Sequence, residues 1–258
     1  MFNDAYVVLC KAGAAKNNLL KKNLLGYIVS AMVAGMFISF GSFFAFSVGQ
    51  IMDGAGAVAA IKLSQSFCFA AALSLIVMAG AELFTGCNLV MAAASIRKEV
   101  SWKDTVILWV VCWLGNLAGS ILSVAMFQVC GIPTAGEGAV AAYFTKIALG
   151  KASYGFSAMM ARAILCNVLV CLAIWCSVKM KSESGKLIMI FWCIMVFMTC
   201  GFEHSIANMS IGGVALFNGG ISLVQYLYII GLPTIGNIIG GAVLVALPYH
   251  IISNKKIY

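Results

Sequence analysis

The residues best suited to chemistry lie in Gly201–Asn208, where a carboxylate (Glu203), an imidazole (His204) and an amide (Asn208) interrupt an apolar segment. Almost every residue from Leu187 to Cys200 is hydrophobic, and the apolar pattern resumes after the interruption. An ionisable side chain inside an apolar membrane segment is costly, and such residues usually face a substrate or ion path. The cluster and the helix-breaking glycine before it therefore predict a path for a polar solute rather than one histidine packed in a core.

Composition places this cluster in a membrane protein. Hydrophobic residues make up 63% of the 258 residues and charged residues 9%, with a mean hydropathy of +1.04, whereas about a quarter of the residues of a soluble domain are charged. Because a helical crossing needs roughly 20 residues, we expect one transmembrane domain over residues 1–258 and no sizeable soluble domain. The net charge of +8 reflects loops beside a membrane, so we expect no nucleic-acid partner.

Six apolar segments predict an all-α membrane protein with six transmembrane helices. Two of the segments, the second and the fifth, are interrupted, at Ala81–Asn88 and at Gly201–Asn208. Non-helical backbone at membrane depth is tolerated only where it is buried in protein or lines a cavity, so both interruptions point to the path. The predicted spans are about 24–48, 63–83, 105–129, 156–178, 187–208 and 232–252.

An internal repeat organises these spans. Glu82 and Glu203 lie 121 positions apart, and so do Asn116 and Asn237, each within a Gly-Asn-x-x-Gly motif. Each half then holds three spans, an odd number, so the second half must enter the membrane in the opposite orientation. We therefore expect an inverted 3+3 repeat, with the transport site where the halves meet.

Basic residues predict the orientation, because cytoplasmic loops are rich in Lys and Arg. With the N-terminus inside, the outer loops hold only Lys62, Lys146 and Lys151, so both termini are expected in the cytoplasm. Residues 1–23, which lack a long apolar core, are predicted to form a cytoplasmic amphipathic segment. Arg162 is the one cation left within a span. The inner segments hold Lys11, Lys16, Lys21, Lys22, Arg97, Lys98, Lys103, Lys179, Lys181, Lys186, Lys255 and Lys256.

The cysteines and histidines predict neither a metal nor a cofactor. The ten cysteines form no Cys-x-x-Cys motif and mostly lie in apolar runs, where cysteine acts as a small hydrophobe. His204 and His250 are the only histidines, and we expect His250 to be a surface residue. An intramembrane metalloenzyme would need several ligands in one place. We therefore expect a protein that is not an enzyme.

Four motifs together resemble the formate/nitrite transporter family of bacterial inner-membrane channels. In chain order they read AELFTG (Ala81–Gly86), NVLVCLAIW (Asn167–Trp175), GFEHSIANM (Gly201–Met209) and GNIIGG (Gly236–Gly241). The resemblance covers all six predicted spans. It implies an aquaporin-like six-helix protomer with the inverted 3+3 repeat, and a homopentamer in membrane lipid with one pore per subunit. It also implies that the pore carries small monovalent weak-acid anions such as formate, nitrite or hydrosulfide.

The resemblance also implies roles for individual residues. His204 is similar to the central pore histidine of the family, and Lys151 to the lysine that attracts the anion in the outer vestibule. Glu203 resembles a structural residue that holds the break beside the histidine. Thr85, Asn167, Asn208 and Asn237 match polar positions of the path or of the broken helices, Leu83 the inner apolar constriction, and Phe69 and Phe197 the outer one.

General chemistry favours the same function. A bare anion at mid-membrane pays a much larger desolvation penalty than its neutral conjugate acid, and an imidazole is the side chain best able to exchange a proton near neutral pH. The alternative is an aquaporin-like channel for small neutral solutes or for gases such as ammonia. The asparagine–proline motifs of aquaporins are missing, and Lys151 at the outer mouth favours anions over ammonia.

Overall fold

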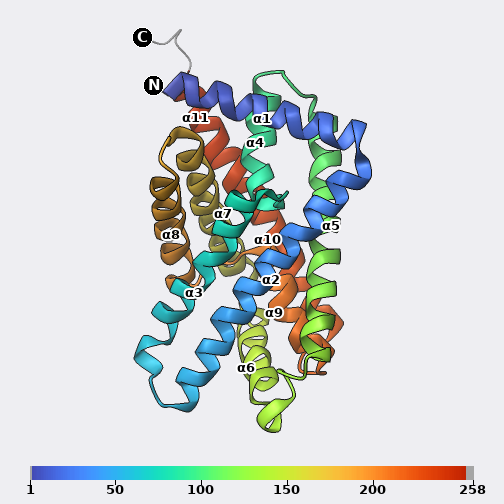
Figure 1. Ribbon diagram of the computed structural model, residues 1–258, viewed down its shortest axis with the longest axis vertical. Coiled ribbons are helices and arrows are strands. Elements are labelled where there is room, and N and C mark those ends of the chain that lie inside the picture. Colours follow the sequence, from blue (N-terminus) through green and yellow to red (C-terminus); the bar gives the residue numbers. More distant parts are fainter. Residues whose placement is uncertain (1, 254–258) are drawn as a thin grey trace.

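The computed structural model describes residues 2–253, and in that part of the chain every regular element is helical (Figure 1). Met1 and residues 254–258, which include the basic residues Lys255 and Lys256 of the charge count, lie outside the described residues. The elements are α1 (Phe2–Lys22), α2 (Leu24–Gly54), η1 (Val58–Ala60), α3 (Ile61–Leu75), η2 (Ile76–Gly80), α4 (Phe84–Ile96), α5 (Trp102–Val129), α6 (Ala135–Ala152), α7 (Phe156–Lys179), α8 (Glu183–Thr199), α9 (Ser205–Phe217), α10 (Leu223–Ile238), η3 (Ile239–Ala246) and α11 (Leu247–Ser253).

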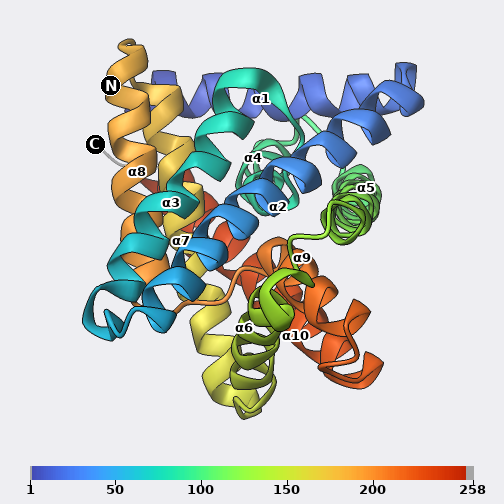
Figure 2. The ribbon, with the colours of Figure 1, turned by 60° about the horizontal axis from the view of Figure 1, so that its bottom comes forward.

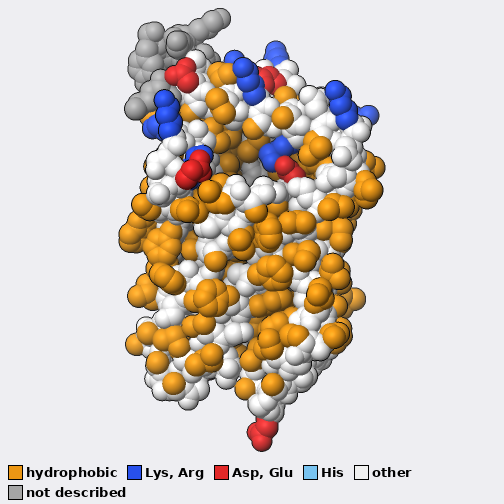
Figure 3. Space-filling view, in the orientation of Figure 1, with side chains coloured by type: hydrophobic (Ala, Val, Ile, Leu, Met, Phe, Trp, Pro, Cys, Tyr) orange, Lys and Arg blue, Asp and Glu red, His pale blue; other side chains and the backbone are white. Residues whose placement is uncertain are grey.

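Five helical stretches of the described chain are long and apolar enough to cross a membrane: 24–54, 58–80, 102–129, 156–179 and 223–253. Two shorter apolar helices, α4 and α9, complete the bundle. Figures 1 and 2 show α1 lying across one end of the bundle and α6 at the opposite end. In Figure 3, apolar side chains cover the middle of the visible face, and charged side chains gather mainly toward the α1 end. This is a multi-pass membrane protein.

The second predicted span is interrupted, as expected. Helix α3 continues into the π-helical turn η2, which ends at Gly80 with φ +81°. Residues 81–83 are not helical, and α4 begins at Phe84. The amide of Glu82 donates to the carbonyl of Ser30 (3.3 Å), and the amide of Phe84 to Oδ1 of Asn116 (2.9 Å). Both of these backbone donors are bonded, as a low-dielectric interior requires.

The fifth predicted span is interrupted in the same way. Helix α8 ends at Thr199, Gly201 adopts φ +71°, and α9 begins at Ser205. The amide of Glu203 donates to the carbonyl of Arg162 (3.2 Å), and the amide of Ser205 to Oδ1 of Asn237 (2.9 Å). Each bond at the first break thus has a counterpart at the second.

The repeat is therefore visible in the contacts as well as in the sequence. Asn116 Nδ2 donates to the carbonyls of Ala31 and Glu82, and Asn237 Nδ2 donates to those of Ala163 and Glu203. In Figure 1, α4 lies toward the α1 end and α9 toward the α6 end. The full six-span inverted relation of the two halves stays a prediction.

Close backbone packing holds the long helices together at glycines. A Cβ on Gly119 would lie 1.9 Å from the carbonyl oxygen of Met32, and one on Gly240 would lie 2.4 Å from that of Ile164. These two glycines occupy corresponding places in the Gly-Asn-x-x-Gly motifs. Small residues let membrane helices approach this closely, because no hydrophobic effect drives association in lipid.

We expect Gly119→Ala to destabilise the protein by about 1–3 kcal/mol, since the added methyl must push α2 away from α5. Gly231→Ala is the matched control, because no atom lies within 4 Å of its added Cβ. It should be neutral or slightly stabilising. Thermal unfolding of both variants in detergent checks the prediction, and equal melting temperatures would contradict it.

Two predictions about helix positions need correction. The sixth span begins at Leu223, earlier than the predicted start at Leu232, because Ser222 and Gln225 form a capping box there and the helix tolerates Pro233 in its interior. The segment predicted as a loop around Lys146 and Lys151 forms α6, which becomes regular after the left-handed residues 136–138.

The N-terminal segment forms α1, as predicted, but it is a packed element. It buries Tyr6, Leu9 and Cys10 and contacts α4. His250, predicted at the surface, is half-buried with its ring centroid 5.6 Å from that of Tyr6. The aromatic residue on α1 covers the histidine, a contact that no spacing rule could have indicated.

Candidate functional site

His204 lies where the two broken helices meet. It caps α9: its Nδ1 accepts a hydrogen bond from the amide of Ala207 (3.1 Å). Its Nε2 lies 3.0 Å from Oγ1 of Thr85, in the first turn of α4. Because Nδ1 must keep its lone pair to cap the helix, the neutral ring carries its hydrogen on Nε2 and donates it to Thr85. The N-termini of α4 and α9 thus converge on a single hydrogen bond.

Convergent helix N-termini make the surroundings of this bond favourable to negative charge. Each N-terminus is the positive end of a helix dipole, equivalent to roughly half an elementary charge. Ordinary helix packing would not require two such ends to face one histidine. The electrostatics of the centre therefore favour an anion over a cation.

An adjoining cavity of about 410 Å³ leads to His204 from the α6 end of the bundle. We call it the Lys151 vestibule. Its cations come from the start of α3, from α6 and from α7, and its deep end is formed by the break before α9. The lining residues used below are Lys62, Lys146, Lys151, Tyr154, Arg162, Phe197, Gly201, Glu203, His204 and Asn208.

Lys151 forms an ion pair with Glu203. Its Nζ lies 3.0 and 2.9 Å from the two carboxylate oxygens, and the Glu203 side chain is only 2% exposed. Asn208 Nδ2 donates to the same carboxylate (2.8 Å) and to the carbonyl of Ile229 (2.7 Å). A buried carboxylate needs such partners, because desolvation is otherwise prohibitive. Lys151, Glu203 and Asn208 thus act together to hold the break.

A similar pair occurs at the first break. Lys16 of α1 forms an ion pair with Glu82, whose other carboxylate oxygen accepts a hydrogen bond from the thiol of Cys87 (3.4 Å). Sequence reasoning found Glu82 through the repeat but did not assign Lys16 a partner. The available signal was a lysine on an amphipathic helix close in sequence to the first span. Its partner lies 66 positions away, so only the folded chain identifies it.

The remaining predicted asparagines form hydrogen bonds between helices. Asn167 Nδ2 bonds the carbonyl of Thr85 (3.3 Å), Oδ1 of Asn88 (3.0 Å) and the carbonyl of Asn237 (2.6 Å). Asn167 and Asn237 are both fully buried. They join α4, α7 and α10, whereas Asn208 also lines the vestibule.

The predicted outer constriction lies beside the same centre. The Phe69 and Phe197 rings meet edge to face with centroids 5.9 Å apart, and Phe197 stacks beside His204 at 6.0 Å. Leu83 belongs to the extended segment of the first break, 121 positions before His204. The two halves thus place a leucine and a histidine at corresponding points of their breaks.

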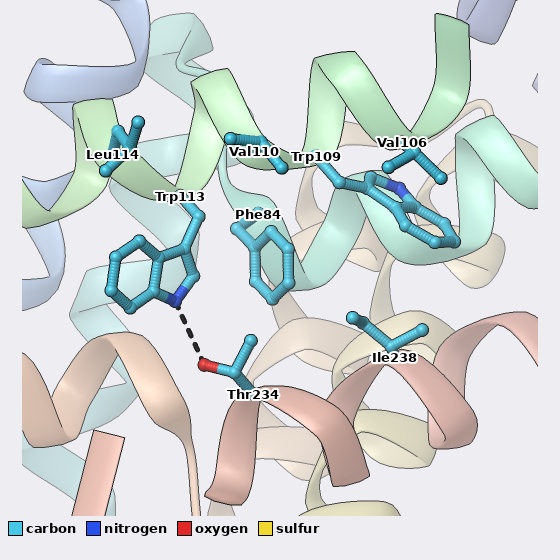
Figure 4. Close-up of a pocket in the computed structure, with 8 residues that line it drawn as sticks. All are labelled: Phe84, Val106, Trp109, Val110, Trp113, Leu114, Thr234 and Ile238. Atoms are coloured by element: carbon cyan, nitrogen blue, oxygen red, sulfur yellow. Dashed lines mark hydrogen bonds between the residues drawn. The ribbon is translucent and has the colours of Figure 1, made fainter. Parts of the chain in front are cut away.

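A second cavity, of about 340 Å³, is apolar and lies between α5 and α10 (Figure 4). Trp113 and Thr234, again 121 positions apart, are joined across it by a hydrogen bond of 2.9 Å. The pocket therefore lies where the two halves meet. Its lining residues are Phe84, Val106, Trp109, Val110, Trp113, Leu114, Thr234 and Ile238, none of which carries a charge. It offers nothing that would bind an anion.

Fold and site together define a multi-pass membrane transport protein in which two interrupted helices meet at a buried polar centre. The family profile described as formate/nitrite transporter matches residues 3–251. The nitrite transporter NirC of Escherichia coli (strain K12) is 33% identical over 258 residues, covering 96% of this chain and 91% of that protein. The chain therefore belongs to the formate/nitrite transporter family.

Solved structures agree with this assignment. A structure described as an FNT family ion channel superposes with a TM-score of 0.90 at 27% identity, covering 97% of this chain and 99% of that one. A structure described as a pentameric formate channel with formate bound gives a TM-score of 0.76 at 26% identity, covering 90% and 98%. The all-α channel fold expected from the sequence is confirmed.

Proposed function

We propose that the protein moves small monovalent anions of weak acids, namely formate, nitrite or hydrosulfide, across a bacterial inner membrane through a pore in each subunit of a homopentamer. The observation that carries the proposal is the meeting of two helix N-termini at His204 and Thr85, at the deep end of a cation-lined cavity. The pentameric formate channel supports the assembly and the substrate class. We place the Lys151 vestibule outside and α1 in the cytoplasm, as the distribution of Lys and Arg indicates.

The proposed path runs from this vestibule past Phe69 and Phe197 to His204, and then past Leu83 to the side of α1. Positive charge in the vestibule concentrates the anion, although Glu203 offsets much of the charge of Lys151. The apolar rings before and after the centre hold back water and hydrated ions. Glu203 and the buried asparagines maintain the backbone conformation of both breaks.

We further propose that a proton is transferred at His204. The ring takes a proton from hydronium in the vestibule, which leaves water, and passes that proton to the anion. The anion then crosses the apolar zone as its neutral acid while His204 returns to its neutral form. The charged ring has hydrogens on both nitrogens, so Nδ1 must then release the amide of Ala207. Protonation is thereby coupled to the first turn of α9.

Uptake into proteoliposomes tests the proposed function. We expect formate, nitrite and hydrosulfide to enter faster through the protein than into protein-free liposomes, and lactate, which is larger, to enter more slowly. Ammonia flux, followed with an internal pH dye, tests the alternative of a gas channel. Rapid ammonia entry with no anion uptake would replace the proposal by that alternative.

A further inference from the structure

Arg162 is the only cation in the interior of a predicted span, and its side chain is held in a defined position. Nη1 donates to the carbonyl of Gly201 at 2.6 Å, and the guanidinium carbon lies 4.1 Å from the centroid of the Tyr154 ring. Both neighbours also line the Lys151 vestibule. The plane of the guanidinium group is thus set by a ring on one side and a carbonyl at one corner.

Arg162 has no carboxylate partner among residues 2–253, unlike Lys146 and Lys151 of the same vestibule. Lys151 is paired with Glu203, and Lys146 is paired with Asp53 at 2.8 Å, a hydrogen bond that raises the pKa of Lys146. Lys62 is also unpaired in that range but lies exposed at the mouth of the vestibule. Arg162 is therefore the one fixed, uncompensated positive charge of the vestibule.

Comparison of the two breaks distinguishes the role of Arg162 from the role of the lysine–glutamate pairs. Both breaks have such a pair, so the pair belongs to the architecture that the two halves share. The carbonyl that accepts from Glu203 belongs to Arg162, and the one that accepts from Glu82 belongs to Ser30. The two halves thus place a guanidinium at one break and a hydroxyl at the other. The first break is therefore held without a guanidinium, whereas at the second break the guanidinium also bonds the carbonyl of Gly201.

We propose that Arg162 recognises a bent, planar anion with two oxygens, and so makes the protein selective for formate or nitrite over hydrosulfide. This inference rests on the proposed function and deepens it. A guanidinium presents five N–H donors in a rigid fork that fits two oxygens at once, whereas an ammonium is a point charge. Gly201 takes one of those donors. Hydrosulfide has a single acceptor atom and gains nothing from a second parallel donor.

The test compares Arg162→Lys, which keeps the charge and removes the fork, with wild type. In proteoliposomes we expect the half-saturating concentrations of formate and nitrite to rise about tenfold, as expected for the loss of one charge-assisted hydrogen bond. That of hydrosulfide should change less than about twofold. Lys146→Gln is the control for charge, and it should affect all three anions alike. An equal loss for all three anions in Arg162→Lys, or no change for any, would overturn the inference.

A binding measurement keeps this test separate from the proposed function. Titration of the detergent-purified protein with ¹³C-formate, followed by NMR line broadening, should show saturable binding to wild type and weaker binding to Arg162→Lys. Liposomes in which wild type moves none of the three anions would contradict the proposed function alone. Equal formate binding by wild type and Arg162→Lys would contradict the role of Arg162 whatever the flux.

Discussion

Glu203→Gln is expected to destabilise the protein by about 3–5 kcal/mol, because it leaves the ammonium of Lys151 without its partner. Both side chains of this pair are largely buried, at 15% and 2% exposed, so water cannot replace the lost carboxylate. The amide group introduced by the substitution would also present a donor toward Nζ of Lys151. We expect a lower melting temperature in detergent and a smaller folded oligomer fraction.

A double-mutant cycle isolates this interaction. Lys151→Met alone should also destabilise the protein, and Lys151→Met combined with Glu203→Gln should recover a large part of the loss, since no buried charge then remains. Asp53→Asn is the matched control, because it breaks the more exposed pair with Lys146 and should cost less than about 1 kcal/mol. Additive losses in the double variant would show that the two side chains act independently.

His204→Asn is expected to remove the pH dependence of transport while the protein still folds. Asparagine is a preferred N-cap residue, so its side-chain oxygen can accept the bond from the amide of Ala207 that Nδ1 now accepts. It cannot titrate. We therefore expect proton-linked uptake to be lost and a pH-insensitive anion leak to remain. Flux of formate or nitrite from about pH 5 to about pH 8, read beside an internal pH dye, measures both.

Thr85→Val serves as the control for this variant. It removes the partner of Nε2 but leaves the imidazole and its cap in place, so a pH dependence close to wild type is expected with an altered rate. Should His204→Asn retain the wild-type pH profile and still move protons with the anion, His204 would be a structural cap only. The anion would then have to take its proton directly from the aqueous vestibule, without His204.

Much of this fold could be predicted because apolar length and periodicity depend on the chain alone. The spans were set by the number of consecutive apolar residues, and the two breaks by glycines beside buried polar residues. Both breaks are present at the expected places. Helix α6 was missed because its alanines and glycines have no amphipathic stripe. The early start of α10 is not evident from the sequence because the helix runs through Pro233, a residue type that usually marks a helix boundary.

The sequence by itself determined that the protein lies in a membrane, that it has two halves with matching motifs, and that His204 is the chemically distinctive residue. Only the tertiary structure decided which charged side chains have a partner of opposite charge. A net charge or a spacing cannot show that Lys151 is held by Glu203, that Lys16 reaches Glu82, or that Arg162 is left with a carbonyl and a ring. The reason is physical: whether a buried charge is neutralised depends on distances of a few ångströms between residues far apart in the chain.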